Sequence, residues 1–104
     1  MEVLANVDLV KKANIYFNGN VTSRTFIDTD GSKKSLGIMM PGEYNFGTNE
    51  PELMEILAGE VKVKLAGEDT WNTYTENTSF NVKGNSDFDI KVKTITDYCC
   101  SYIK

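Results

Sequence analysis

Four carboxylates lie close together in one short segment, and they are the first candidates for chemistry. Glu43, Glu50, Glu52 and Glu55 fall within thirteen consecutive positions. Such a cluster is most often a solvated rim, because charged side chains are seldom buried. The alternative is that Glu52 or Glu55 lines the mouth of a barrel and binds sugar hydroxyls. Alternate residues of a regular strand share one face, so these two glutamates cannot both point inward.

A metal site is the second possibility, and the residue types argue against a transition metal. A metal-binding jelly roll usually places two histidines, a glutamate and a third histidine on adjacent strands. Here Thr48 and Glu50 occupy the positions of the histidine pair. Glu52 occupies the position of the glutamate, and Phe88 that of the third histidine. The chain contains no histidine, so we expect neither a catalytic metal nor a Ser–His or Cys–His nucleophile pair.

Few cationic side chains are available to bind an anion. The candidates are Arg24, Lys33, Lys34 and Lys83. A lysine pair just after a turn is most often a solvated edge that prevents aggregation, which is the alternative for Lys33 and Lys34. Aromatic side chains are mostly core residues, but one or two could stack on a nucleobase, since every base offers a π-face. The aromatic candidates are Tyr44, Phe46, Trp71, Tyr74, Phe80 and Phe88.

The two cysteines, Cys99 and Cys100, are neighbours in a segment typical of a C-terminal strand. A bridge between adjacent cysteines is strained, and disulfide scaffolds use spaced pairs. We therefore expect two reduced, buried thiols with a structural role, in a cytoplasmic protein. The N-terminal residues MEVLANVDLVKK lack a basic leader followed by an apolar block, so no secretory signal is predicted.

Length and composition indicate one globular domain spanning residues 1–104. Hydrophobic residues make up 40% and charged residues 25% of the chain, as in ordinary globular proteins. No apolar run approaches the roughly 20 residues needed to cross a bilayer, so no membrane association is expected. The net charge is −4. Nucleic acid is therefore not an expected partner, although a local cluster of cations can still bind phosphate.

Turn signals recur every eight to twelve residues, and the segments between them are rich in Val, Ile, Thr, Phe and Tyr. This spacing predicts about nine or ten short strands, arranged as an all-β jelly roll or closed barrel. Residues 61–65 and 88–93 alternate apolar and charged side chains, as half-buried strands do. Residues 28–32 are predicted to form a hairpin loop, with Gly31 available for positive φ. Residues 1–12 are either partly helical or an extended arm.

Several motifs occur in an order that resembles one family. They are Ala13-Asn-Ile-Tyr-Phe-Asn-Gly19, Leu36-Gly-Ile-Met39, Pro41-Gly-Glu-Tyr-Asn-Phe-Gly-Thr48, Glu50-Pro-Glu-Leu-Met-Glu-Ile56, Trp71, Ser79-Phe-Asn-Val82 and Asp97-Tyr-Cys-Cys-Ser-Tyr102. Together they resemble the small cupin family of pyrimidine/purine nucleoside phosphorylases, from about Ala13 onward. The resemblance implies an RmlC-like cupin barrel that forms a homodimer and requires neither a metal nor another cofactor. This sequence departs from the usual family pattern at Lys83, which replaces a proline.

The activity implied by the resemblance is phosphorolysis of purine and pyrimidine nucleosides to free base and α-D-ribose 1-phosphate, with inorganic phosphate as co-substrate. On this basis we expect phosphate to bind Lys33 or Lys34 with Ser35 or Arg24. Ribose hydroxyls are assigned to Glu52 or Glu55. The base is assigned to Tyr44 or Phe88 by stacking. No residue is assigned to protonate the leaving base.

Two other classes of function stay open from the residues alone. One is a non-catalytic cupin that binds a nucleoside or sugar, which would show saturable binding without phosphate-dependent turnover. The other is an interaction protein with a filled barrel, which would contain no cavity of ligand size.

Overall fold

The computed structural model describes residues 1–104 and confirms the all-β class, with no α-helix. The strands are β1 (Asp8–Leu9), β2 (Asn14–Tyr16), β3 (Val21–Ile27), β4 (Lys33–Met39), β5 (Gly42–Thr48), β6 (Glu52–Ala58), β7 (Glu60–Leu65), β8 (Asn72–Thr75), β9 (Thr78–Val82), β10 (Ser86–Val92) and β11 (Thr96–Tyr102). A 3₁₀ turn, η1 (Phe17–Gly19), follows β2. No helix is long and apolar enough to span a membrane.

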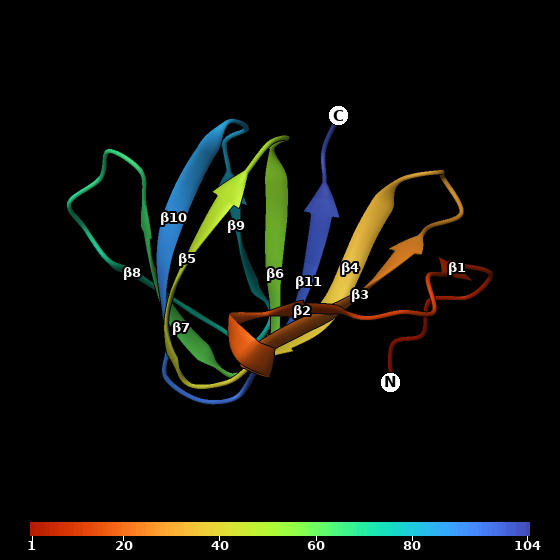
Figure 1. Ribbon diagram of the computed structural model, residues 1–104, viewed down its shortest axis with the longest axis horizontal. Helices are drawn as coiled ribbons and strands as arrows, with labels where there is room; N and C mark the ends of the chain where they lie inside the picture. Colours follow the sequence, from red (N-terminus) through yellow and green to blue (C-terminus); the bar gives the residue numbers. More distant parts are fainter.

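The strands form two antiparallel sheets that face each other (Figure 1). Sheet A has the order β1-β3-β4-β11-β6-β9, with β2 also paired to β3, and sheet B has the order β5-β10-β7-β8. No strand pairing joins the sheets, so the expected closed barrel is corrected to an open two-sheet jelly roll. Figure 1 shows the sheets spreading apart toward the end where the C-terminus lies.

The N-terminal residues form an extended arm rather than a helix. Leu9 of β1 lies opposite Phe26 of β3, and Tyr16 of β2 lies opposite Val21 of the same strand. These two short strands belong to sheet A, and they raise the number of strands above the nine or ten that we expected.

The expected alternation is clear in the strands of sheet B. Val61 and Val63 of β7 are buried, whereas Lys62 and Lys64, which alternate with them, are partly exposed. The predicted hairpin between β3 and β4 is also confirmed. The Gly31 amide donates to the Asp28 carbonyl oxygen over 2.9 Å, and Gly31 has a φ of +84°, a conformation that favours glycine.

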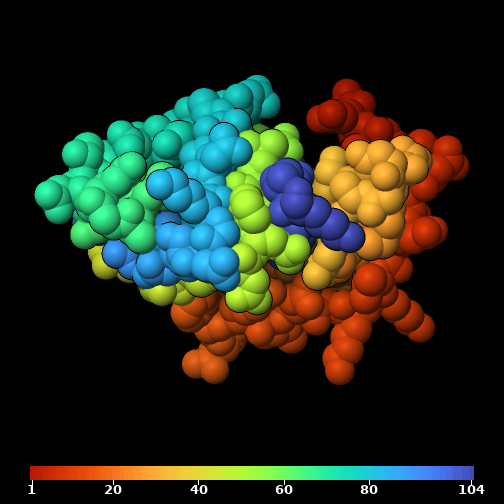
Figure 2. Space-filling view, turned by 90° about the horizontal axis from the view of Figure 1, so that it is seen from above, coloured from red at the N-terminus to blue at the C-terminus, as the bar shows by residue number.

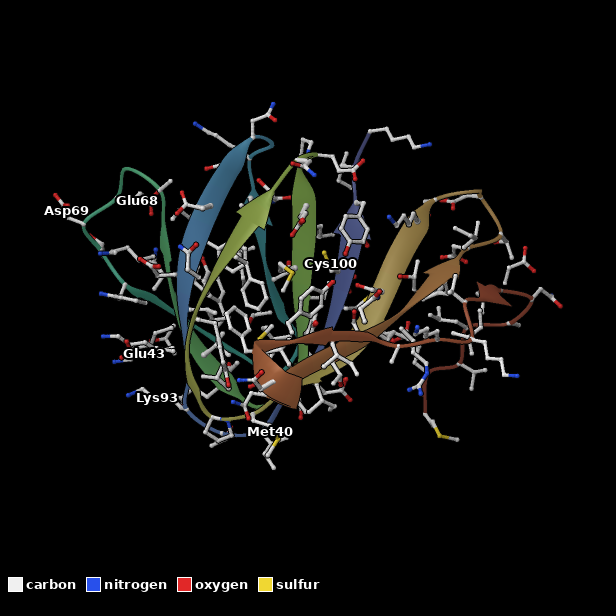
Figure 3. The ribbon with its side chains drawn as sticks, in the orientation of Figure 1. Met40, Glu43, Glu68, Asp69, Lys93 and Cys100 are labelled. Atoms are coloured by element: carbon white, nitrogen blue, oxygen red, sulfur yellow. The ribbon has the colours of Figure 1, made fainter.

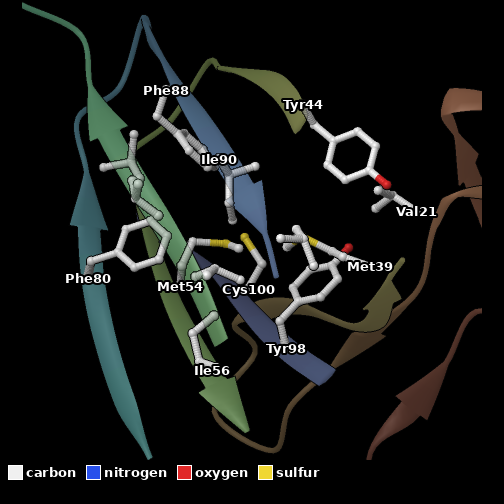
Figure 4. Close-up of a cluster of buried hydrophobic side chains, with 14 residues drawn as sticks. Val21, Met39, Tyr44, Met54, Ile56, Phe80, Phe88, Ile90, Tyr98 and Cys100 are labelled. Carbon is white, nitrogen blue, oxygen red and sulfur yellow. The ribbon is translucent and has the colours of Figure 1, made fainter. Parts of the chain in front are cut away.

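Fourteen buried residues from both sheets form one hydrophobic core. Figure 4 shows Met54, Ile56 and Tyr98 of sheet A facing Phe88 and Ile90 of sheet B. Close packing of this kind is sensitive to the change of even one methylene group. The core therefore holds the two sheets at a fixed separation, on which the geometry of any site between them depends.

Strand β6 contains a bulge at Leu57, opposite the first residues of β11, whose own side chains alternate regularly. The pairing with β6 shifts register between Asp97 and Tyr98. Beyond this point Tyr98, Cys100 and Tyr102 lie on the inner face, and Cys99 lies on the outer face near the charges of Glu55 and Lys34. A bulge changes the alternation locally and increases the twist of the strand.

Gly37 of β4 is a glycine because two neighbours approach it closely. It lies between Ser23 of β3 and Tyr98 of β11 in the sheet register. A Cβ atom at this position would clash with the backbone oxygen of Thr22 and lie 2.9 Å from the Tyr98 hydroxyl. The absence of a side chain lets the Tyr98 ring cross β4, where its hydroxyl donates to the Thr22 carbonyl oxygen over 3.5 Å.

The first prediction concerns this close approach. Gly37→Ala should lower the free energy of unfolding by about 1–3 kcal/mol, because the sheet must move to accommodate the methyl group. Gly47→Ala is the matched control: its nearest neighbour would be the Ser86 carbonyl oxygen at 3.9 Å, so its effect should stay within about 1 kcal/mol. Urea unfolding followed by the fluorescence of Trp71 measures both. Equal midpoints for the two variants would contradict this account of Gly37.

Candidate functional site

A cavity of about 120 Å³ lies between the two sheets. It is lined by Tyr16, Ser23, Ser35, Met39, Phe46, Gly47, Glu52, Met54, Phe88, Tyr98, Cys100 and Tyr102. Small-molecule sites usually measure about 300–1,000 Å³. A ligand larger than one ring must therefore extend through the mouth of this cavity into solvent.

Sheet A supplies the polar side of the cavity. Alternation on β6 brings Glu52 and Met54 to the inner face, and alternation on β11 brings Cys100 and Tyr102 beside them. The Cys100 thiol donates a hydrogen bond to Glu52 Oε1, with a sulfur–oxygen distance of 3.5 Å. Figure 3 shows Cys100 between the two sheets, whereas Glu43 and Lys93 lie at the outside of the molecule.

Aromatic rings form the opposite side. Phe46 of β5 and Phe88 of β10 stack with their centroids 5.7 Å apart and their planes at 28°. Tyr16 packs edge-on against Phe46, with a centroid distance of 6.4 Å. Phe17 contacts the same ring at 5.4 Å and has a φ of +51°. Positive φ is rare for a bulky residue, so the turn η1 is held in a strained conformation that places the Phe17 ring against Phe46.

One cation lies at the mouth. Lys33 Nζ lies 4.9 Å from the centroid of the Tyr102 ring, and Tyr102 lines the cavity. Lys33 and Ser35 share a strand face, since they are two residues apart on β4. Figure 2 shows the C-terminal residues, in blue, between the β3–β4 hairpin and the chain near residue 50.

Burial determines the protonation of the groups around the cavity. Desolvation raises the pKa of Glu52, the hydrogen bond from Cys100 opposes this rise, and the charge of Glu50 adds to it. Burial also raises the pKa of Tyr102 to about 12. The pKa values of Tyr98 and Cys100 are likewise raised, chiefly by desolvation. Glu52 is the only carboxyl group among the lining residues.

The structure brings together only part of the site expected from the sequence. Ser35, Glu52 and Phe88 line the cavity, and Lys33 lies at its mouth. Strand alternation separates Glu52 from Glu55, as expected.

The other predicted residues lie away from the cavity. Glu55 is on the outer face of β6, opposite Cys99 in the register. Lys34 forms an ion pair with Asp28 at 3.0 Å on that outer face. Arg24 donates from Nε to the Lys11 carbonyl oxygen over 3.4 Å. Tyr44 is buried in the core, and its hydroxyl donates to the Met40 carbonyl oxygen.

The positions that hold histidine in a metal-binding jelly roll have other uses here. The Thr48 hydroxyl donates to the Lys83 carbonyl oxygen over 2.6 Å and accepts from the Ser86 amide over 3.1 Å. Thr48 thus fastens the β9–β10 loop to β5, and the contact with Lys83 uses its backbone. No group of three or more His, Cys, Asp or Glu side chains is placed to hold a metal ion.

Several cavity residues were not predicted from the sequence as site residues. They are Tyr16, Ser23, Met39, Gly47, Met54, Tyr98, Cys100 and Tyr102, whereas Phe46 was among the aromatic candidates for stacking. For Tyr98, Cys100 and Tyr102 a signal existed, because they are spaced two apart and so share a strand face. Both cysteines are free and buried as expected, but only Cys100 reaches the cavity.

The family model and the curated relatives that match this chain carry the same family name. The profile of the pyrimidine/purine nucleoside phosphorylase family matches residues 11–102. A protein of Syntrophotalea carbinolica named pyrimidine/purine nucleoside phosphorylase is 55% identical over 104 residues, which is 100% of both chains. A protein of Sulfurimonas denitrificans with the same name is 58% identical, again over 100% of both chains.

Solved structures show the same fold. A protein of unknown function from an Acinetobacter species has a TM-score of 0.92 and 39% identity, covering 95% of this chain and 96% of that one. An RmlC-like cupin from Shewanella frigidimarina has a TM-score of 0.69 at 12% identity, covering 97% of this chain and 86% of that one, and so supports the cupin fold alone. The family expected from the sequence motifs is confirmed: the chain belongs to the pyrimidine/purine nucleoside phosphorylase family.

Proposed function

We propose that this enzyme of the pyrimidine/purine nucleoside phosphorylase family cleaves both purine and pyrimidine nucleosides with inorganic phosphate. The products are the free base and α-D-ribose 1-phosphate. The observation that carries this proposal is the cavity itself, which combines stacked aromatic rings, a single carboxyl group and a cation at the mouth.

The base is assigned to the aromatic side of the cavity. There it lies against Phe88 and Phe46, with Tyr16 next to it at the mouth. Stacking uses the π-face that all bases share, whereas hydrogen bonds to base edges would distinguish them. An aromatic binding surface therefore suits an enzyme that accepts both purines and pyrimidines.

The ribose and phosphate are assigned to the polar side and the mouth. Glu52 faces the ribose, because it is the only carboxyl group that lines the cavity. Phosphate binds Ser35 and Lys33, which share one face of β4, with the lysine at the solvent end. The small volume of the cavity fits this arrangement, since the phosphate then lies in the mouth.

Phosphorolysis passes through a sugar with oxocarbenium character, as glycoside hydrolysis does. Rigidly placed charges and hydrogen-bond donors supply most of the stabilisation of such a transition state. The anionic phosphate oxygens held at the mouth by Lys33 provide negative charge beside the developing positive charge of the ribose. The same phosphate is the nucleophile, so its position also sets the direction of attack.

We further propose that the enzyme needs no metal or other cofactor and acts in the cytoplasm. The donor set supports the first point, because Thr48 and Phe88 replace histidine and Thr48 is engaged with the backbone. The two free cysteines on opposite faces of β11 suit a reducing compartment.

A homodimer is also proposed. The outer face of sheet A carries exposed apolar side chains, with Ile15, Leu36 and Ile38 between 37% and 68% exposed. Contiguous exposed apolar surface of this kind often marks a protein interface. Sedimentation velocity of the purified protein tests this point.

The second prediction is phosphate-dependent turnover. Purified protein should release base and ribose 1-phosphate from inosine and from uridine only when phosphate is present, and treatment with a chelator should leave the rate unchanged. Chromatography measures both products. Saturable nucleoside binding without turnover would favour a non-catalytic cupin, and loss of activity on chelation would contradict the metal-free proposal.

The third prediction separates the two neighbouring lysines. Lys33→Ala should raise the apparent KM for phosphate roughly tenfold, which corresponds to about 1.4 kcal/mol, while the KM for the nucleoside changes little. Lys34→Ala is the matched control, because Lys34 is paired with Asp28 away from the cavity, and its kinetics should match those of the wild type. Equal effects of the two substitutions would show that Lys33 has no specific role.

A further inference from the structure

Phosphorolysis requires a proton for the departing base, and the proposed assignments leave that proton without a source. When the bond between C1′ and the base nitrogen breaks, the bonding electrons pass to the base. Protonation of the base in the transition state makes it a better leaving group, and a positioned acid typically contributes about 10²–10⁴-fold to the rate. The following inference rests on the proposed phosphorolysis.

The cavity offers few groups able to give up a proton near neutral pH. The titratable lining residues are Tyr16, Glu52, Tyr98, Cys100 and Tyr102. Burial raises the pKa values of Tyr98, Cys100 and Tyr102 above their already alkaline ordinary range, so these three groups hold their protons too tightly. Tyr16 is 41% exposed and lies at the mouth, where solvent reaches it.

Glu52 meets two requirements of a catalytic acid: it is held in a fixed position, and its surroundings favour the protonated form. It lies opposite Val82 of β9 and Tyr102 of β11 in the register, so strands on both sides hold it in place. Its burial favours the protonated form before the reaction. The Cys100 thiol, 3.5 Å from Oε1, then donates a hydrogen bond to the carboxylate that forms when the proton leaves.

We propose that Glu52 is the catalytic acid that protonates the departing base, and that Cys100 is the positioning residue that orients and stabilises its carboxylate. An oxygen of hydrogen phosphate forms the bond to C1′, and the bond from C1′ to the base nitrogen breaks. The proton of Glu52 passes to the base. The proton of hydrogen phosphate then passes to Glu52, so the ribose 1-phosphate leaves as the dianion and the acid is restored.

The groups that face Glu52 determine how the activity depends on pH. Tyr98, Cys100 and Tyr102 line the cavity from β11 and Tyr16 lines it from β2. Lys33 of β4 lies over the Tyr102 ring, and the neighbouring negative charge is that of Glu50. The elements of sheet B that face Glu52 contribute Phe46, Gly47 and Phe88, none of which titrates. Because the acid must be protonated, kcat/KM should be high below the raised pKa of Glu52 and fall as the pH rises through it.

The fourth prediction distinguishes an acid from a residue that only binds ribose. Glu52→Gln should lower kcat at least 100-fold with uridine and inosine. With 7-methylguanosine, whose base already carries a positive charge and leaves without a proton, the loss should stay below tenfold. Glu55→Gln, three residues along the same strand on the outer face, is the matched control and should behave as the wild type with all three substrates.

Three other outcomes would overturn the assignment. Equal losses with all three substrates would mean that Glu52 binds ribose without donating a proton. A substrate-selective loss in Tyr16→Phe instead of Glu52→Gln would transfer the role to Tyr16. Wild-type protein that cleaves none of the nucleosides would overturn the proposed phosphorolysis itself, which is a result distinct from the other two. Urea unfolding of each variant identifies any that is not folded, and Glu52→Asp, which keeps the carboxyl group, should recover part of the activity with uridine.

The fifth prediction tests Cys100 by the pH profile. The thiol hydrogen bond favours ionised Glu52 and so lowers its pKa. Cys100→Ala removes this donor, and the alkaline fall of kcat/KM should therefore move to higher pH, with a lower kcat at the plateau. Cys100→Ser keeps a donor and should restore the wild-type profile. A profile that is the same in all three proteins, whatever their stability, would show that Cys100 has only a packing role.

Discussion

The alternation of side chains along β4, β6 and β11 is the constraint on which the rest of the structure depends. It sends Ser35, Glu52 and Cys100 into the space between the sheets, and it sends their neighbours to the outer face. Side chains alternate between the two faces with a period of two residues, so a shift of one residue would move every inward side chain of a strand to the outer face. Each inward group gains a partly desolvated setting, while chemically identical groups such as Cys99 and Glu55 lie across the sheet.

The two ends of the space between the sheets differ in how they are filled. Val21, Ile56 and Val61 are completely buried and pack the sheets together. Toward the other end Ser23 and Ser35, which have small side chains, face the rings of Phe46 and Phe88. Small residues opposite large ones leave a cavity there without disturbing the core. Because Tyr98 lies close against Gly37, its ring lines the cavity without widening the space between the sheets.

Local patterns in the sequence predict much of this arrangement. The alternation in residues 61–65, the turn at Gly31 and the opposite facing of Glu52 and Glu55 all follow from strand geometry and turn chemistry, and the ordered motifs predict the family. The position of Tyr16 could not be predicted, because it depends on a three-residue strand docking on β3. The ion pair of Lys34 with Asp28 could not be predicted either, since it forms only once the hairpin has closed. Whether the two sheets close into a barrel depends on pairing between distant edges, which no local pattern reports.

The register between β11 and β6, which shifts at the bulge of β6 around Leu57, has a consequence for how this protein can diverge. Alternation along β11 sets which of its residues face inward, so a change of length by one residue in the loop at 93–95 has only two outcomes. Either the loop absorbs the change, or Tyr98 and Cys100 exchange places with Asp97 and Cys99. In the second case the acidic side chain of Asp97 would enter the core in place of the Tyr98 ring, and the two cysteines would exchange faces. Insertions and deletions should therefore accumulate in the β3–β4 and β7–β8 loops, leaving point substitution as the only gradual route by which the cavity can change.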